Sequence, residues 1–281
     1  MTAPDFLVIG HAAKDAGQGS WRLGGTVAYA SRQAARLGLR AAVVTRAAPD
    51  VDVKALLPDV LVHLIPSETT TTFENRYVNG RRVQHVRDQA LPIRAEMVPP
   101  ELCEAKLVLL GPLLGEAPIG LARLFPGALV GLCAQGWLRD VRPDRLVVRR
   151  PWTESAALRG VSLIFASEED IEGDKQAQAL WVQEVPIVVI TEGKGGARLY
   201  AEGRWRRIAA FPHEEVDPTG AGDVFAAAFM IAFNETQDVA AAARFAAAAA
   251  GLSVEAAGLA GVPGREEIER VLAEHPEVTL E

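Results

Sequence analysis

The segment Asp217–Asp223 has the sequence DPTGAGD and runs directly into VFAAAFMIAF at residues 224–233. Pro218 and the small residues 220–222 predict a turn that opens abruptly into an apolar helix. The first N–H groups of such a helix have no partner within it and carry the positive end of the helix dipole. The turn therefore predicts an anion site that needs no basic side chain.

Asp223 falls in the first turn of this predicted helix, where an acidic side chain has two interpretations. It can be a helix cap, because Asp is favoured near helix starts. It can also be a general base that accepts a hydroxyl proton while the oxygen attacks phosphorus. An isolated Gly-Ala-Gly-Asp would favour the cap. The whole stretch with its flanking signals favours the base, because an acid beside an anion site brings no structural benefit.

The N-terminal region predicts a β-α-β unit. Residues 6–10 (FLVIG) form a short apolar run typical of a buried strand, and residues 41–45 (AAVVT) predict a second strand. Between them, residues 24–38 begin with two glycines, are rich in Ala and end at Gly38, as a helix would. This order favours a parallel sheet flanked by helices.

Further apolar runs extend this sheet. They lie at residues 107–110, 129–133, 161–165 and 186–190, most of them separated by plausible helices. Residues 198–209 predict a short meander with a turn at Glu202-Gly203, and three helices are expected at 221–233, 239–253 and 265–274. The predicted fold class is α/β with a doubly wound sheet.

Residues 69–88 (TTTTFENRYVNGRRVQHVRD) have a different character. Thr, Phe, Tyr and Val alternate with polar residues around Asn79-Gly80, a strong hairpin turn signal. The hairpin is either an edge element of the sheet or a lid over a site, and the sequence alone weighs these two interpretations about equally.

Composition and charge exclude several classes of protein. The chain has 281 residues, of which 49% are hydrophobic and 23% charged, as in ordinary globular domains. Cys103 and Cys133 lie far apart, which excludes a disulfide scaffold or a thiolate zinc site. The five histidines include no i, i+4 pair, so a histidine-built metal site is not expected.

The net charge of -7 argues against a protein that coats nucleic acid. No apolar run is long enough for a membrane helix, and the N-terminus does not resemble a signal peptide. We therefore expect a cytoplasmic protein without a nucleic-acid or membrane partner. The sequence also contains neither a GxxxxGK[ST] phosphate loop nor a dinucleotide-binding GxGxxG.

DPTGAGDVFAAAF resembles the C-terminal signature of the ribokinase, or PfkB carbohydrate kinase, family. The resemblance implies a three-layer α/β/α sandwich with a small β-hairpin lid. We take residues 1–281 as one kinase domain with its lid insertion at about 68–90. Such kinases transfer the γ-phosphoryl group of ATP to a sugar or nucleoside hydroxyl. By this resemblance Gly220, Ala221 and Gly222 form the anion hole and Asp223 is the base.

Other matched motifs imply the substrate and nucleotide residues. GHAAKD at residues 10–15 places Asp15 on substrate hydroxyls, and a carboxylate can accept from two of them. The paired glycines Gly24 and Gly25 let the substrate approach the backbone. TEGKGG at 191–196 matches the loop that holds nucleotide phosphates, and residues 248–254 border the adenine or form a plain core helix. The residues implied for ATP are Ser167, Thr191, Gly193, Gly196, Gly220 and Gly222.

The metal positions are partly substituted. Ser167–Asp170 (SEED) stands where the family has N-x-x-E, which orders Mg²⁺ and its waters, and Asp170 can still act through water. Asp217 and Thr219 match positions that bind a monovalent cation, such as K⁺, in some relatives. The expected cofactors are ATP, Mg²⁺ and K⁺.

The acceptor is less well defined by the sequence. Tyr29 replaces the family's usual Asn, and only eight residues separate Asp15 from Gly24, so the lid is expected to rest mainly on the hairpin. Together with the TTTFENRY segment and SEED, these features resemble the inositol-kinase-like branch. The expected substrate-binding residues are Asp15, Gly24, Gly25, Tyr29, Phe73, Asn75, Gln135 and Arg139.

Three functions remain open at this stage. The first is a kinase for a small sugar or cyclic polyol, with myo-inositol as one candidate. The second is a nucleoside kinase of the same fold, whose pocket would need an apolar wall for the base. The third is a non-catalytic sensor, against which the presence of Asp223 argues. The sequence does not decide between a monomer and a homodimer.

Overall fold

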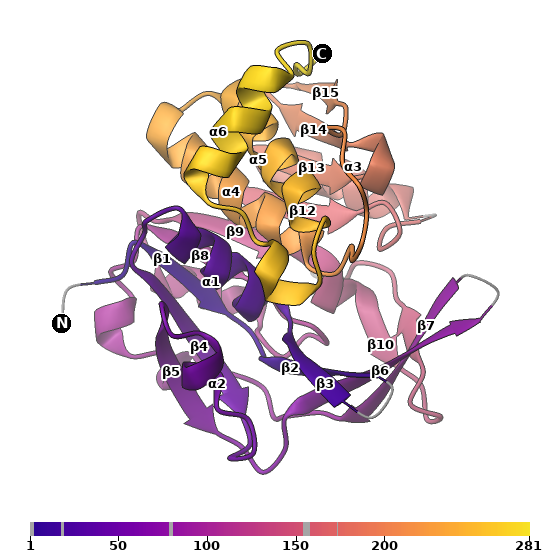
Figure 1. The fold of residues 1–281 in the computed structure, drawn as a ribbon. Helices are drawn as coiled ribbons and strands as arrows, with labels where there is room; N and C mark the ends of the chain where they lie inside the picture. The colour runs from indigo at the N-terminus through magenta and orange to yellow at the C-terminus, as the bar shows by residue number, and fades with distance from the viewer. Residues whose placement is uncertain (1–2, 18–19, 79–80, 154–157, 173) are drawn as a thin grey trace.

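The main sheet is built from nine strands within the described part of the chain. The computed structural model describes residues 3–17, 20–78, 81–153, 158–172 and 174–281. The strands are β1 (Phe6–Ile9), β4 (Ala41–Ala47), β5 (Leu61–Pro66), β8 (Leu107–Leu110), β9 (Leu129–Cys133), β12 (Leu163–Ser167), β13 (Ile187–Thr191), β14 (Ala197–Ala201) and β15 (Arg204–Ile208). Their order is β15-β14-β13-β12-β9-β8-β1-β4-β5, as Figure 1 shows. All neighbours from β5 to β13 are parallel, and β14 is antiparallel to both of its neighbours.

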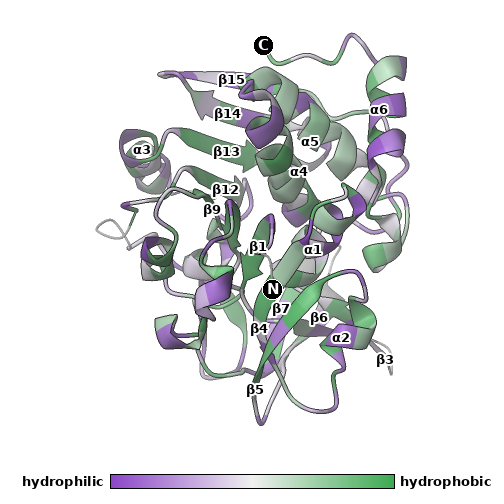
Figure 2. Ribbon diagram, turned by 90° about the vertical axis from the view of Figure 1, so that its left-hand side faces the viewer, coloured by the Kyte–Doolittle hydropathy of each residue, from purple (hydrophilic) through white to green (hydrophobic). Residues whose placement is uncertain are grey.

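Helices cover both faces of this sheet, which confirms the three-layer α/β/α sandwich (Figures 1 and 2). One face carries α1 (Thr26–Arg36), α4 (Ala221–Thr236), α5 (Val239–Ser253) and α6 (Arg265–Glu274), and the other carries α3 (Lys175–Glu184). The short α2 (Val53–Leu56) precedes β5. Alternate residues of β1 enter two separate cores: Phe6 and Val8 pack toward α4, and Leu7 and Ile9 toward the opposite layer. Burial on both faces explains why these strands are continuous apolar runs.

The connections on the α3 face differ from expectation. The strand predicted at residues 161–165 is β12, which begins at Leu163 and ends at Ser167. Among the described residues, the helices between the strands of the main sheet include 3-10 helices at Ile119–Leu124 and Ala134–Leu138. The second is followed by the strand pair β10 (Arg139–Val141) and β11 (Val147–Arg149), which the sequence did not predict because both strands are short.

A second sheet forms the lid. Its strands are β2 (Ala13–Gly17), β3 (Ser20–Gly24), β6 (Thr71–Val78) and β7 (Arg81–Asp88), in the order β3-β2-β6-β7. The expected hairpin at 69–88 supplies the two longer strands of this sheet, and β2 and β3, which the sequence did not predict, supply the other two. The sequence AKDAG of β2 has no apolar alternation, so its pairing with β6 could not be predicted locally. The expected Asn79-Gly80 turn lies outside the described residues.

Helices in the described part of the chain are too short or too polar for any of them to cross a lipid bilayer.

Candidate active site

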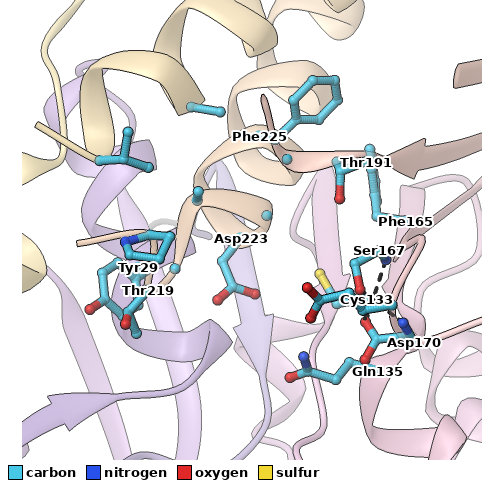
Figure 3. A pocket seen from close by; sticks show the side chains of 18 of the residues that line it. Tyr29, Cys133, Gln135, Phe165, Ser167, Asp170, Thr191, Thr219, Asp223 and Phe225 are labelled. Atoms are coloured by element: carbon cyan, nitrogen blue, oxygen red, sulfur yellow. Dashed lines mark hydrogen bonds between the residues drawn. The ribbon is translucent and has the colours of Figure 1, made fainter. Parts of the chain in front are cut away.

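A pocket of about 590 Å³ lies between the lid and the loops at the carboxyl ends of the parallel strands. Cys133, Ser167 and Thr191, the last residues of β9, β12 and β13, all line it. Open α/β sheets bind ligands at this edge, outside the carboxyl ends of their strands. The pocket also receives the start of α4, so it joins the lid to the predicted anion site (Figure 3).

The turn before α4 has the geometry that its glycines permit. Gly220 is the N-cap residue in the left-handed conformation, with φ 82°. A Cβ atom at this position would lie 2.2 Å from Cδ1 of Tyr29, so the aromatic ring packs directly on the turn. The first backbone N–H groups of the helix lack partners within the helix. Gly220, Ala221, Gly222 and Asp223 all line the pocket, as an anion site requires.

Asp223 is half-buried in the first turn of α4, and its carboxyl group points into the pocket (Figure 3). Burial raises the pKa of Asp223 to about 6. A hydrogen bond with the Thr26 side chain and the charge of Arg139 oppose this rise, whereas Asp170 and Asp15 add to it. A carboxylate with a pKa close to neutrality is well suited to accept a proton from a hydroxyl group.

Tyr29 lies between the acceptor and anion regions. Its side chain is 4% exposed, and burial raises its pKa, with further contributions from the charges of Asp217, Asp15 and Asp223. The phenol therefore stays protonated at neutral pH. The sequence marked Tyr29 as a departure from the family pattern, and the structure shows that the ring packs against the turn at Gly220.

Asp15, on the lid strand β2, lines the pocket near Gly25. Gly24 does not line the pocket, but its missing side chain makes room for Asp15: a Cβ atom there would lie 2.0 Å from Oδ2 of Asp15. Gly25 has φ +90° and a Cβ atom there would lie 2.7 Å from the His11 carbonyl oxygen. The two glycines therefore serve different geometric needs.

The part of the pocket next to Asp15 and the lid is called the acceptor half, because the family resemblance implies the phosphoryl acceptor there. It is also lined by Phe73, Gln135 and Arg139. Phe73 is buried with Ala13 and Leu113, and these residues give the pocket an apolar wall. Asn75 is not among the lining residues. Its Oδ1 accepts a hydrogen bond of 3.0 Å from Gln84 Nε2, and Gln84, which the sequence did not single out, occupies the pocket wall instead.

The loops after β12 and β13 form the other half of the pocket. It is called the donor half, because the family resemblance implies the nucleotide there. Ser167 Oγ donates a 2.7 Å hydrogen bond to Asp170 Oδ2, which joins the two substituted metal positions (Figure 3). Thr191, Gly193 and Gly196 line the same region. Gly196 has φ +90°, and a Cβ atom there would lie 2.0 Å from the Ile208 carbonyl oxygen, so this position requires glycine.

The far end of the donor half is apolar. This end is lined by Ala247, Ala250 and Gly251 of α5, by Val254 directly after the helix, and by His213. His213 Nδ1 lies 2.7 Å from the Phe211 carbonyl oxygen, which can only accept, so Nδ1 carries the proton. The helix that was expected either to border the adenine or to form plain core therefore both packs in the core and reaches the pocket.

The donor side also offers oxygen ligands for a magnesium ion. Glu168, Glu169 and Asp170 line the pocket, and Mg²⁺ commonly needs only one or two carboxylates, with waters and substrate phosphates completing its shell. No group of three or more His, Cys, Asp or Glu side chains in the described residues has the geometry of a metal cage. The donor set thus fits a nucleotide-bound Mg²⁺.

Asp217, the expected ligand of a monovalent cation, does not line the pocket. Its Oδ1 accepts from Thr219 N at 3.0 Å and its Oδ2 from Gly258 N at 3.2 Å. The guanidinium of Arg22, on β3, lies 3.4 Å from Oδ2. Both oxygens are already engaged and a positive charge is close by, so these residues do not fit a potassium ion well.

Sequence reasoning missed three side chains around Asp223. Thr26 bonds to its carboxylate, and Gln84 contacts Arg139. The thiol of Cys133 is buried beside Asp223, and burial raises its pKa, followed by the charges of Asp223 and Asp170. Thr26 directly follows the paired glycines and Cys133 ends a predicted strand. The rule that open α/β sheets bind ligands at the edge where their strands end could therefore have indicated both residues. No local signal marks Gln84.

Solved structures of known proteins share this fold. A pyrophosphate-dependent kinase of the ribokinase family, solved with a pyrophosphate analog and myo-inositol, superposes with a TM-score of 0.80 at 24% identity. The match covers 94% of this chain and 99% of that one. The fold is therefore the ribokinase fold.

Sequence comparisons match parts of the chain to carbohydrate kinases. Residues 152–263 match the family model described as pfkB family carbohydrate kinase. Ribokinase of Bacillus subtilis (strain 168) is 51% identical over 85 residues, which cover 30% of this chain and 29% of that protein. Inositol 3-kinase of Oryza sativa subsp. japonica is 57% identical over 42 residues, 15% of this chain and 11% of that protein.

A longer match is more distant. Cytidine kinase of Thermococcus kodakarensis is 27% identical over 255 residues, 82% of this chain and 88% of that protein. The matches to the ribokinase and the inositol kinase span less than a third of those proteins' lengths. The part of the chain that matches the PfkB carbohydrate kinase model, residues 152–263, contains the DPTGAGD signature that implied this family.

Proposed function

We propose that this chain is an ATP-dependent kinase that transfers the γ-phosphoryl group to a hydroxyl of a small sugar or cyclic polyol, with Asp223 as the general base. The observation that carries this proposal is the position of Asp223. A carboxylate with a pKa of about 6 stands beside a helix N-terminus at the point where the acceptor and donor halves of one pocket meet.

The reaction assigns a role to each end of the pocket. Asp15 and the backbone at Gly25 hold the acceptor so that one hydroxyl faces Asp223. As the acceptor oxygen attacks the γ-phosphorus, the oxygen–phosphorus bond to ADP breaks and the hydroxyl proton passes to Asp223. The N–H groups of residues 220–222 stabilise the charge on the transferring group. The lid excludes water, which limits hydrolysis of ATP.

Ser167 and Asp170, with Glu168, would hold the Mg²⁺ that accompanies the nucleotide. A bound Mg²⁺ would neutralise charge on the phosphate oxygens. The phosphate loop at 191–196 and the α5 end near Gly251 and His213 would enclose the rest of the donor.

A cyclic polyol is the acceptor that the pocket supports best. Asp15, Gln84, Gln135 and Arg139 supply polar contacts around the apolar wall at Phe73. An acceptor with hydroxyls on its rim and an apolar ring face would use both kinds of contact. The likenesses to inositol 3-kinase and to a kinase solved with myo-inositol support this class.

A nucleoside kinase is the second candidate. It is favoured by the match to cytidine kinase over 82% of this chain and by the aromatic side chains of Tyr29 and Phe73 at the acceptor end. The position of Asp223 argues against the third candidate, a sensor without activity, because ligand binding alone does not need a base.

A turnover assay separates these candidates. ADP or phosphate release is measured with ATP or pyrophosphate as donor and with myo-inositol, ribose, fructose, 2-keto-3-deoxygluconate and nucleosides as acceptors. Saturable turnover on a polyol or sugar is expected. Turnover on nucleosides alone would support the second candidate, and tight nucleotide binding without turnover would support the sensor.

The Asp223→Asn variant tests the base. We expect nucleotide binding to be retained and kcat to fall at least ~100-fold, on the scale of general-base catalysis. Binding is measured by calorimetry, with Asp140→Asn, an exposed acid outside the pocket, as the matched control. Near-normal turnover of Asp223→Asn would contradict the assignment.

Potassium dependence remains a hypothesis drawn from the family resemblance. It is tested by comparing rates in potassium chloride and in tetramethylammonium chloride at equal ionic strength. Because Arg22 and two backbone N–H groups already engage Asp217, we expect the same rate in both salts.

A further inference from the structure

The pocket is strongly acidic for a site that would bind a polyanionic donor. Its described lining includes seven carboxylates, those of Asp15, Glu168, Glu169, Asp170, Glu192, Glu215 and Asp223. The same lining includes two permanent cations, Arg139 and Lys194. Lys194 is 75% exposed and lies 3.6 Å from Glu215 at the mouth of the pocket. Arg139 is 14% exposed, so it is the cation that lies deep in the pocket.

Arg139 is held between the lid and the donor loops. It begins β10, directly after the 3-10 helix that follows β9. Its Nη1 donates to Gln84 Oε1 at 3.3 Å, and Gln84 is itself bonded to Asn75 on the neighbouring lid strand. Its Nη2 lies 3.9 Å from Oδ1 of Asp170, whose other oxygen accepts from Ser167. A polar chain thus runs from β6 and β7 of the lid to the metal positions after β12.

The charge of Arg139 also acts on the proposed base. The groups that surround Asp223 are Asp15 on the lid, Thr26 on α1, Cys133 at the end of β9, and Asp170 and Arg139 on the opposite wall. Burial, Asp170 and Asp15 raise the pKa of Asp223, and Arg139 and Thr26 lower it. Arg139 is therefore the cation that favours the ionised base.

A guanidinium group between the base and the metal positions has the chemistry to contact a transferring phosphoryl group. Its planar set of N–H donors matches phosphate oxygens, and it stays charged at all relevant pH values. In phosphoryl transfer, charge develops on the equatorial oxygens while the attacking and leaving oxygens lie in line. Arg139 lines the pocket, lies 3.9 Å from Asp170, and is close enough to Asp223 for its charge to lower the pKa of that carboxyl group.

We propose that Arg139 is a catalytic residue that contacts the transferring phosphoryl group, and that Gln84 is a positioning residue that orients it from the lid. This assignment rests on the proposed kinase function. During the reaction the proton moves from the acceptor hydroxyl to Asp223, and the γ-phosphoryl group passes from ATP to the acceptor oxygen, with ADP as the leaving group. Arg139 neither gains nor loses a proton. Because Gln84 belongs to β7, closure of the lid and orientation of the guanidinium occur together.

The variants Arg139→Gln, Arg139→Lys and Gln84→Leu test this assignment, with Arg142→Gln as a control. Arg142 is an exposed arginine three residues along that pairs with Asp144 and does not line the pocket. For Arg139→Gln we expect kcat to fall ~100-fold or more, as for loss of one charge-stabilising donor. Binding of ADP, measured by calorimetry, should change less than about threefold, because ground-state contacts are largely retained.

The pH profile separates a catalytic role from a merely structural one. Loss of the positive charge in Arg139→Gln should move the acid limb of kcat/KM to higher pH. Arg139→Lys keeps the charge, so its acid limb should stay near that of the wild type while kcat remains low. Gln84→Leu should lower kcat about tenfold with an unchanged acid limb, since it alters only the orientation of the guanidinium.

If wild type and Arg142→Gln turn over and Arg139→Gln turns over equally well, or its acid limb does not move, the role of Arg139 is overturned and the kinase function stands. If no acceptor is phosphorylated by the wild type, the proposed function fails and the role of Arg139 fails with it. The thermal unfolding midpoint of each variant is recorded, and Arg139→Lys supplies the test where Arg139→Gln does not fold.

Discussion

Asp223 shows how one residue acquires its chemistry from its surroundings. Its place in the first turn of α4 would suit a helix cap, as the sequence also allowed. Burial, together with Asp170 and Asp15, instead brings its pKa to about 6. The same side chain that would cap a helix on the surface is here a group able to take up a proton near neutral pH.

This pKa predicts the pH dependence of the reaction. The base acts only when ionised, so kcat/KM should fall about tenfold per pH unit below the pKa of about 6. The contribution of Asp223 to the stability of the fold changes with pH in the opposite direction to the activity. Its pKa is raised on folding, so it stabilises the fold most at acid pH and this contribution is lost as the pH rises through about 6. An acid limb of kcat/KM that begins near 3.8, the ordinary pKa of an aspartate, would contradict the prediction.

Gly220 is the second position at which a single residue decides the site. We expect Gly220→Ala to lower kcat about 100-fold, because the turn must shift to release the strain of a positive φ and the contact with Tyr29. Gly120→Ala is the matched control, since a Cβ atom at Gly120 meets nothing within 4 Å. Steady-state kinetics and thermal unfolding of both variants check this expectation, which fails if both behave like the wild type.

At the scale of elements, the buried side chain of His11 helps to tie the lid to the sheet. His11 follows β1, and its Nε2 lies 3.0 Å from the Leu91 carbonyl oxygen. That oxygen can only accept, so Nε2 donates and Nδ1 accepts from Thr71 Oγ1 at 2.8 Å. The start of β6 and the segment after β7 are therefore tied to the same imidazole ring. Burial lowers the pKa of His11, consistent with a neutral ring.

Loss of this tie should be costly. His11→Leu leaves a buried carbonyl and a buried hydroxyl without their partner, and we expect a loss of about 2–4 kcal/mol in the free energy of unfolding. His63→Leu, at a partly exposed position on β5, is the control and should cost less than about 0.5 kcal/mol. Denaturant unfolding measures both, and equal effects of the two substitutions would show that the tie is not stabilising.

The elements differ in how far the sequence could predict them. β1, β4, β8 and α6 match the predicted segments closely, because each is a local run of apolar or helix-forming residues. The lid strand β2 could not be predicted, since its stability comes from pairing with β6, more than fifty residues along the chain. β10 and β11 are too short to carry a periodic pattern.

At the scale of the whole molecule, two separate apolar cores hold the sandwich together. The core on the α3 side contains Trp181, which is fully buried and makes an edge-on contact with Trp152 at a ring-centroid distance of 5.1 Å. Figure 2 shows hydrophobic colouring along β13 and along α4 and α5 of the opposite layer. The sheet edge that bears the active site is thus supported from both faces.

The α3-side core gives a prediction for global stability. Trp181→Ala should lower the free energy of unfolding by about 3–5 kcal/mol, because a large cavity opens against the sheet. Trp205→Ala, at a tryptophan that is 39% exposed on β15, should cost about 1 kcal/mol. Chemical denaturation of the two variants makes the comparison, and a similar loss for both would show that the α3 layer is not needed for the fold.

The sequence by itself determined the α/β class, the resemblance to carbohydrate kinases and the turn at Asp217–Asp223, because each depends on residues that are neighbours in the chain. Most of the expected site residues do line one pocket, whereas Gly24, Asn75 and Asp217 stand behind it. Only the tertiary structure decided the four-stranded lid, the raised pKa of Asp223 and the position of Arg139 between Gln84 and Asp170. These features depend on burial and on charges brought together from distant segments of the chain. Neither burial nor the arrangement of these charges can be predicted from residues that are neighbours in the sequence.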